Sequence, residues 1–189
     1  MQRTVTYFER PGRENTEECL KISLNAIREL GLKHIVVAST TGSTGLLFAE
    51  AMKDLNVNLV IVTHSAGFKS PNTKEIPDEL REKILRTGAK VYTGTMITHS
   101  LETAFSQKFS GLYPTLIVAQ TLRRFGEGPK VCLEIVMMAT DAGLIPEDEE
   151  ILAVAGTAYG ADTVMIVRSA ASKRFLNLRV VEILAMPRG

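Results

Sequence analysis

The apolar positions of this chain form short unbroken runs that alternate with longer stretches of helical period. An unbroken apolar run predicts a strand buried on both faces, which is typical of a parallel sheet. Such runs occur at residues 35–38 and 151–155, and mainly apolar runs at 57–62, 91–93 and 163–167 also predict strands. Alternating apolar and polar residues at 178–185 predict one further strand.

The stretches between these strands carry apolar residues at helical spacing, with residues at their ends that start or stop a helix. Asn15 and Thr16 are good N-cap residues, Pro77 suits a first helical turn, and Gly31 and Gly88 suit positions just past a helix. We therefore predict helices at residues 16–30, 46–55, 77–87, 100–109, 113–125 and 128–142.

The alternation of strands and helices predicts an α/β fold with a mixed, mainly parallel sheet and helices on both faces. About ten residues join the last two strands, and a parallel crossover needs about a dozen or more. We therefore expect these two strands to pair antiparallel, at an edge of the sheet. No repeat, linker or change of composition divides residues 1–189, so we expect a single domain.

Composition excludes several classes of protein. The 189 residues are 45% hydrophobic and carry a formal net charge of +1, so a strongly basic nucleic-acid binder is not expected. Cys19 and Cys132 are too few for a disulfide framework, and no CxxC or Cys/His cluster predicts zinc or another metal. Residues 1–15 lack the apolar core of a signal peptide, and no apolar run is long enough to span a bilayer. We expect a cytoplasmic protein without a membrane partner.

Polar segments follow four of the predicted strands. In open α/β sheets, ligands bind beyond the carboxyl ends of the strands, where the strand order reverses. The four segments should lie along that edge, and they contain the candidate binding residues. They cover residues 39–45, 64–68, 93–99 and 156–162.

The first segment, at residues 39–45, joins a strand to a helix and is rich in hydroxyl groups and glycine. Such a turn can bind phosphate, because glycines permit close approach and a helix N-terminus supplies free N–H groups. Its alternative is a capped turn that binds nothing. The spacing matches no G-x-G-x-x-G, Walker A or G-x-S-x-G motif. Its residues are Ser39, Thr40, Thr41, Gly42, Ser43, Thr44 and Gly45.

The other segments supply candidate groups for the rest of a ligand. Tyr159 could stack on a planar ring, although the turn around it could equally be structural, with Asp162 bonded to its own backbone. His64 and His99 could transfer protons, or could simply bond to backbone. Phe68 could cover a ligand or hold its loop in place. The candidates outside the first turn are His64, Ser65, Gly67, Phe68, Thr93, Gly94, Thr95, His99, Gly156, Thr157, Tyr159, Gly160, Ala161 and Asp162.

The last predicted helix and the polar residues after it offer further groups. Glu134, Met137, Met138 and Asp141 fall on one side of this helix, where a carboxylate could be a buried partner for the loops or mark the boundary of the core. Arg168 and Lys173 could supplement an anion site, with surface placement as the alternative.

Taken in order, these segments resemble a family of small stand-alone proteins similar to the carboxy-terminal domain of pyruvate kinase. No single motif is specific, but the ordered set covers nearly the whole chain. The matching pieces are residues 12–17, 39–45, 63–68, Thr93-Gly94-Thr95 with His99, 134–146 and 156–162.

The resemblance implies a three-layer α/β/α sandwich with a mixed core sheet of five strands. In the full-length kinase, this domain holds an allosteric sugar phosphate at a turn like residues 39–45. The catalytic barrel is not part of the match, so phosphoryl transfer to pyruvate is not expected. Stand-alone members look like binders of flavin mononucleotide (FMN), and Phe68, Tyr159 and Met137 would then line the flavin ring.

We therefore predict a protein that binds FMN through its phosphate, possesses no assigned catalytic residue, and forms a homo-oligomer. A flavin-dependent oxidoreductase would be a further step. One alternative is a non-catalytic sensor that binds a sugar phosphate or a similar anion. Another is a structural homo-oligomer whose turn is merely capped.

Overall fold

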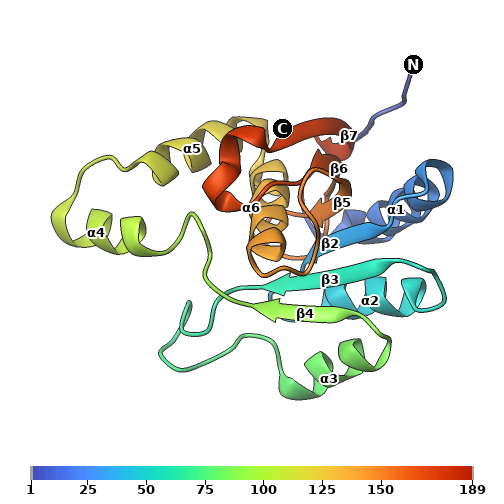
Figure 1. Ribbon diagram of the computed structural model, residues 1–189, viewed down its shortest axis with the longest axis horizontal. Helices are drawn as coiled ribbons and strands as arrows, with labels where there is room; N and C mark the ends of the chain where they lie inside the picture. Colours follow the sequence, from blue (N-terminus) through green and yellow to red (C-terminus); the bar gives the residue numbers. More distant parts are fainter. Residues whose placement is uncertain (1, 189) are drawn as a thin grey trace.

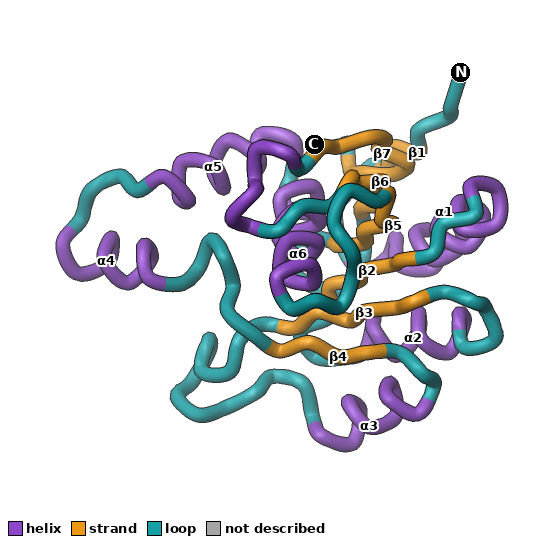
Figure 2. The backbone as a smooth tube through the Cα atoms, viewed as in Figure 1, coloured by secondary structure: helices purple, strands orange, loops and turns teal. Residues whose placement is uncertain are grey.

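The computed structural model describes residues 2–188, in which seven strands form one sheet (Figures 1 and 2). The strands are β1 (Thr6–Phe8), β2 (His34–Ala38), β3 (Asn58–Thr63), β4 (Lys90–Thr93), β5 (Glu150–Ala155), β6 (Thr163–Arg168) and β7 (Arg179–Pro187). The α-helices are α1 (Thr16–Leu30), α2 (Ser43–Met52), α3 (Asp78–Arg86), α4 (Leu101–Phe109), α5 (Pro114–Leu122) and α6 (Glu127–Asp141). Short 3₁₀ helices are η1 (Arg13–Asn15), η2 (Arg123–Phe125) and η3 (Ser172–Asn177).

The strand order is β1-β7-β6-β5-β2-β3-β4. Strand β6 pairs antiparallel with both β5 and β7, whereas the other neighbouring pairs are parallel. The prediction of a mixed, mainly parallel sheet is therefore confirmed. The order reverses around β2, which has β3 on one side and β5 on the other, so the β2–β5 crevice is the switch point where a ligand is expected.

Two details of the sheet differ from the sequence predictions. The antiparallel pair β6–β7 lies inside the sheet rather than at its edge, because β1 pairs parallel with the end of β7. The five-stranded core implied by the resemblance is extended to seven strands. Strand β1 has three residues, too few to produce a recognisable pattern in the sequence.

Alternate residues of each central strand enter two different cores. On β2, Ile35 and Val37 pack with residues of α1, α2 and α3, whereas Val36 packs with residues of α6. Side chains of successive strand residues point to opposite faces, so this division places the sheet between two helical layers. The three-layer α/β/α sandwich is confirmed.

Candidate functional site

A cavity of about 460 Å³ lies at the carboxyl ends of β2, β3 and β5, beside the first half of α6. It sits at the β2–β5 crevice, and its volume falls in the range of roughly 300–1,000 Å³ that small-molecule sites occupy. The lining is part polar and part apolar. Hydroxyl groups come from the turn after β2, and the apolar wall comes from Val62, Met96, Ile135 and Met138.

The structure brings together residues from all four polar segments. Residues that the sequence places far apart, such as Thr41 and Thr157, line one cavity because both follow parallel strands that are neighbours in the sheet. The predicted site residues in its lining are Ser39, Thr40, Thr41, Thr44, His64, Phe68, His99, Gly156, Thr157, Tyr159 and Gly160.

The remaining candidates lie near the cavity but outside its lining. Thr93 exemplifies them, because its hydroxyl is hydrogen-bonded to the hydroxyl of Thr63 at 2.7 Å. Met137, which was expected to line the flavin ring, is buried outside the cavity lining. Its neighbour Met138 lines the cavity instead. The candidates outside the lining are Gly42, Ser43, Gly45, Ser65, Gly67, Thr93, Gly94, Thr95, Ala161 and Asp162.

Arg168 and Lys173, the two cations that could have supplemented an anion site, lie outside the cavity lining. Arg168 lines a separate surface cleft and forms ion pairs with Asp148 and Glu150. Asp141 accepts a hydrogen bond from the amide of Ser172. These groups therefore stabilise the surface on which α6 and β6 end.

The turn after β2 is held by a side chain at its first position. The hydroxyl of Ser39 accepts a hydrogen bond from the amide of Gly45 at 2.8 Å, and the amide of Ser39 donates to the carbonyl of Val62 at 2.9 Å. The first intrahelical bond of α2 is from the amide of Leu46 to the carbonyl of Gly42. The amides of Ser43 and Thr44, at the start of the helix, are the kind of donors that bind an anion.

The two glycines of this turn serve the packing of α2. Gly42 has φ of +91°, and a Cβ there would come within 2.7 Å of Leu80 on α3. A Cβ at Gly45 would come within 2.7 Å of Ile61 on β3. Close approach of protein to protein, rather than to a ligand, therefore explains both glycines.

Asp162 fixes the turn after β5. Its fully buried carboxylate accepts hydrogen bonds from the amides of Gly12 and Thr157 at 3.0 and 2.9 Å, and from the hydroxyl of Thr163 at 2.9 Å. Gly160 has φ of +76°, and the backbone of Arg13 occupies the place where its side chain would be. The 156–162 segment is thus a rigid wall, and Asp162 bonds to its own turn as one alternative expected.

His64 and His99 both lie close to the ring of Phe68. The ring centroids of His64 and Phe68 are 4.3 Å apart, and those of Phe68 and His99 are 5.9 Å apart. Nδ1 of His64 lies 2.9 Å from Oε1 of Glu75, a partner that the sequence did not indicate. Phe68 therefore holds its loop against both histidines and also forms part of the cavity wall.

A buried ion pair lies beside the cavity. Lys130 is 2% exposed and pairs with Glu134 one helical turn later. Oε1 of the same carboxylate accepts hydrogen bonds from the amide and hydroxyl of Thr98. Burial raises the pKa of Glu134, but Lys130 and Thr98 outweigh burial and hold the pKa below its ordinary value. Of the two interpretations given for Glu134 above, the buried partner of a loop therefore agrees with the structure.

Charges around the cavity come in matched pairs. Arg123 and Glu127 also line it, with Nε of Arg123 2.7 Å from Oε1 of Glu127. Burial and the nearby Lys130 lower the pKa of His99, which favours its neutral form. An anionic ligand would therefore depend on hydroxyl and amide donors near residues 39–45, supplemented by the free N–H groups of Arg123.

Sequence reasoning missed Lys130 and Arg123 as lining residues. Lys130 stands between Pro129 and Val131 in an apolar helix, and the one available signal was Glu134 at the i+4 position. Arg123 lies near the end of the helix predicted at residues 113–125, where a cation commonly lies at the surface. Neither residue belongs to one of the polar segments that follow the strands.

Among residues 2–188, no helix combines the length and the apolar character needed to cross a membrane. Within the same part of the chain, His, Cys, Asp and Glu side chains do not gather in groups of three or more that could hold a metal ion.

The model of one protein family, described as the pyruvate kinase alpha/beta domain, matches residues 17–167. Similar solved structures include a pyruvate kinase from Cryptosporidium parvum and a Cryptosporidium parvum pyruvate kinase in complex with ADP, at 16% and 17% identity and a TM-score of 0.44 each. Both matches cover 82% of this chain but 23% and 24% of theirs, so the chain spans about a quarter of their length. O-ureido-L-serine synthase matches at 15% identity and a TM-score of 0.33, over 69% of this chain and 48% of its own.

Proposed function

The chain belongs to the family of the pyruvate kinase alpha/beta domain, and from this premise we propose that it binds FMN in the cavity at the β2–β5 crevice. The phosphate would lie at the turn of residues 39–45 and the start of α2. The flavin ring would lie against the apolar wall. The observation that carries the proposal is the meeting of these two surfaces in one cavity.

The phosphate end of the site is supported by the donors of the turn. Thr40, Thr41 and Thr44, which carry hydroxyl groups, line the cavity, and α2 starts at Ser43, between Thr41 and Thr44. Hydroxyl donors and a helix N-terminus together favour a doubly charged group. The guanidinium of Arg123 lies beside the same cavity. Its Nε pairs with Glu127, so its other N–H groups can donate hydrogen bonds to an anion.

The ring end of the site is supported by its shape and by its apolar character. Val62, Met96 and Met138 give a wall suited to a flat aromatic system, and Phe68 and Tyr159 lie at the lining as aromatic partners. A bound flavin would supply electron or hydride transfer. The residues of this chain would orient the ring and shield it from water, with the neutral Lys130–Glu134 pair buried beside the cavity.

A reducing, cytoplasmic setting belongs to the same proposal. Cys19 and Cys132 are both free and buried. Burial, with Asp162 and Glu18 nearby, raises the pKa of Cys19 to about 12, so this thiol is protonated and inert at neutral pH.

The test is ligand binding by the purified protein. Protein isolated from cells is expected to be yellow, and the released compound to have the absorbance and mass of FMN. Titration of ligand-free protein is expected to quench flavin fluorescence with FMN, and far more weakly with riboflavin, which lacks the phosphate. Equal affinity for the two flavins would contradict the role of the turn. Colourless protein that ignores FMN but is stabilised against heat by sugar phosphates would replace FMN with the sensor alternative.

A further inference from the structure

Helices α4 and α5 leave the body of the protein. We call residues 101–122, which comprise both helices and their connection, the arm. In Figures 1 and 2 the arm extends away from the sheet on the side opposite α1. None of the nine residues of α4 is buried, and in α5 only Ala119 is. The arm therefore has little contact with the rest of the chain.

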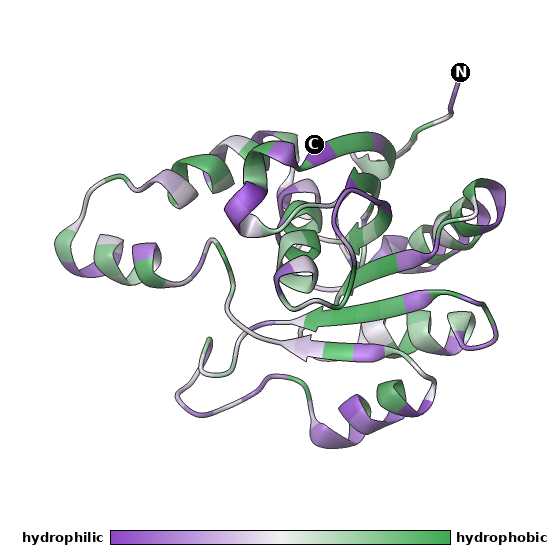
Figure 3. Cartoon of the chain, viewed as in Figure 1, coloured by the Kyte–Doolittle hydropathy of each residue, from purple (hydrophilic) through white to green (hydrophobic). Residues whose placement is uncertain are grey.

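The surface of the arm lacks the charges of a solvated helix. Of its 22 residues only Glu102 and Lys108 are charged, against 23% of the whole chain. Helix α3, which is an outer helix of the same protein, has six charged residues in nine, and two i,i+4 ion pairs run along it. Figure 3 shows this contrast, with α3 largely hydrophilic and hydrophobic residues distributed along α4 and α5.

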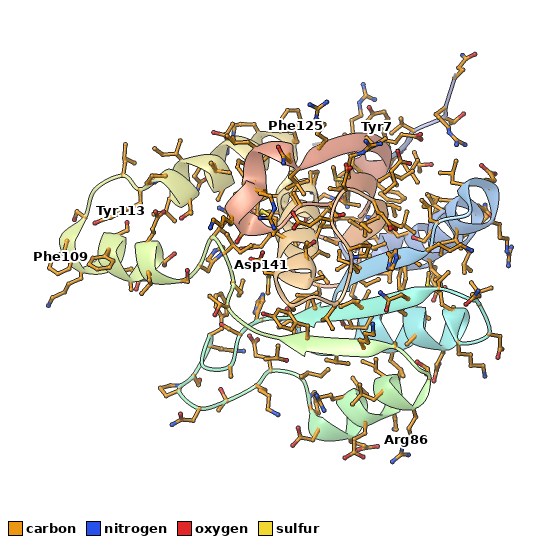
Figure 4. All side chains as sticks on the ribbon, viewed as in Figure 1. Tyr7, Arg86, Phe109, Tyr113, Phe125 and Asp141 are labelled. Atoms are coloured by element: carbon orange, nitrogen blue, oxygen red, sulfur yellow. The ribbon has the colours of Figure 1, made fainter. Side chains whose placement is uncertain are left out.

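Exposed apolar side chains take the place of these charges. The ring centroids of Phe105 and Phe109 are 5.8 Å apart, and those of Phe105 and Tyr113 are 6.4 Å apart. Phe109 is 68% and Leu112 86% exposed. Figure 4 shows Phe109 and Tyr113 near the outer end of the arm. Aromatic enrichment and charge depletion are the features that distinguish the centre of a protein interface from ordinary surface.

The arm is also internally fixed. The carboxylate of Glu102 in α4 accepts hydrogen bonds from the amide of Thr115, at 2.7 Å, and from its hydroxyl. This contact joins the first turn of α4 to the first turn of α5. A preformed surface of this kind can bind a partner without first being ordered.

The chain exposes more surface than is usual for its mass, as expected for a protein whose partner covers part of it. A globular chain of 20.7 kDa exposes about 8,900 Å² by the usual dependence of surface on mass. This chain exposes 10395 Å², an excess of about 1,500 Å² over that figure, and an interface of standard size covers about 800 Å² on each partner. In Figure 1 the arm projects from the body, as do the short N-terminal segment before β1 and the loop between β3 and α3.

We propose that the arm is a dimerisation surface that binds a second copy of this chain. Its one acidic and one basic residue cancel, so two copies can approach by the same face without repulsion. An apolar patch centred on Phe105, Phe109 and Leu112 is complementary to itself, as a two-fold interface requires. A charged or nucleic-acid partner would find no matching charge on this surface.

The test is the mass of the protein in solution, measured by sedimentation or light scattering. The wild-type chain is expected to have twice the 20.7 kDa mass of one chain, or a larger even multiple. The double variant Phe105→Asp, Phe109→Asp is expected to lose the contact and at least halve that mass. A matched control is Leu176→Asp, which changes a 91% exposed residue of η3, outside the arm, and should leave the mass unchanged.

Two further measurements keep the outcome decisive. Circular dichroism should show that the double variant keeps its secondary structure, since both residues are exposed; if it does not, Leu112→Asp replaces it. Amides of the arm in the wild type should exchange hydrogen faster on dilution. A wild-type mass of 20.7 kDa at all concentrations, or an unchanged mass in the folded arm variants, would overturn the proposal.

Discussion

The carboxylate of Glu134 on α6 accepts hydrogen bonds from both the amide and the hydroxyl of Thr98, at 2.8 and 2.7 Å, across 36 positions of sequence. Thr98 lies in the loop that leads from β4 to the arm, and Glu134 also neutralises the buried Lys130 beside the cavity. One carboxylate thus connects the cavity wall to the base of the arm. Several consequences of such contacts can be measured.

The first concerns the buried pair itself. Glu134→Leu should lower the free energy of unfolding by about 3–5 kcal/mol, because it leaves Lys130 buried without a counter-charge. Denaturant unfolding measures the change. The double variant Lys130→Met, Glu134→Leu should recover most of the loss, because no buried charge remains. A double variant as unstable as the single one would show that the cost comes from lost packing or from the Thr98 contact instead.

The second concerns the close approach of η1 to the turn after β5. Gly160→Ala should lower the free energy of unfolding by at least about 2 kcal/mol, because the new methyl group would overlap the backbone of Arg13 and φ is +76°. Gly143→Ala is the control. Gly143 has φ of +66° with nothing within 4 Å of a Cβ, so it should show only the conformational cost of about 1 kcal/mol. Equal losses in the two variants would contradict the packing argument.

The third concerns the proposed phosphate donors. Thr44→Ala should weaken FMN binding about tenfold, the effect of losing roughly 1.5 kcal/mol from a hydrogen bond to a charged group. Riboflavin binding should change little. Ser43→Ala is the matched control, because Ser43 is its neighbour in the same turn but does not line the cavity. Fluorescence titration gives both affinities, and a larger loss in Ser43→Ala would contradict the assignment.

The fourth concerns pH. Hydrogen bonds from Arg174 and from the amide of Ala171 lower the pKa of Glu147 from 4.5 to about 2. Because the folded pKa is the lower one, the stabilisation is complete above pH 4.5 and is lost as the pH falls toward about 2. Carboxyl NMR titration should find this value, and Arg174→Ala should raise it toward 4.5. Arg168→Ala, which removes pairs with Asp148 and Glu150, should leave it unchanged.

The periodicity of the sequence was enough to predict the main elements of the fold. Apolar runs identified β2 to β6 and an alternating stretch identified β7, because side chains of these strands enter the two cores between the sheet and its helices. Strand β1 was not predicted, since its three residues are defined by pairing with β7 rather than by their own pattern. The β5–β6 hairpin could have been predicted, because the seven residues of the 156–162 segment are too few for a parallel crossover.

The site was predictable only where it follows the strands. The sequence predicted that Thr41 and Thr157 lie near each other, because the ends of their strands share one edge of the sheet. The places of Lys130, Arg123 and Glu75 could not be predicted, since their positions depend on how α6, η2 and the loop between β3 and α3 pack. The two helices of the arm were predicted from their local sequence pattern. Their position away from the sheet could not be predicted, because it depends on tertiary packing.

The pairing of β1 with β7, and of Gly12 with Asp162, sets an order on folding during synthesis. Residues 6–12 leave the ribosome well before the residues with which they pair, because Asp162 follows Gly12 by 150 positions and the partners of β1 lie later still, in β7. A nascent chain stalled before residue 156 would possess β2, β3 and β5 but neither the second wall of the cavity nor an anchor for residues 6–12. Ligand binding can therefore begin only after the 156–162 segment has been made.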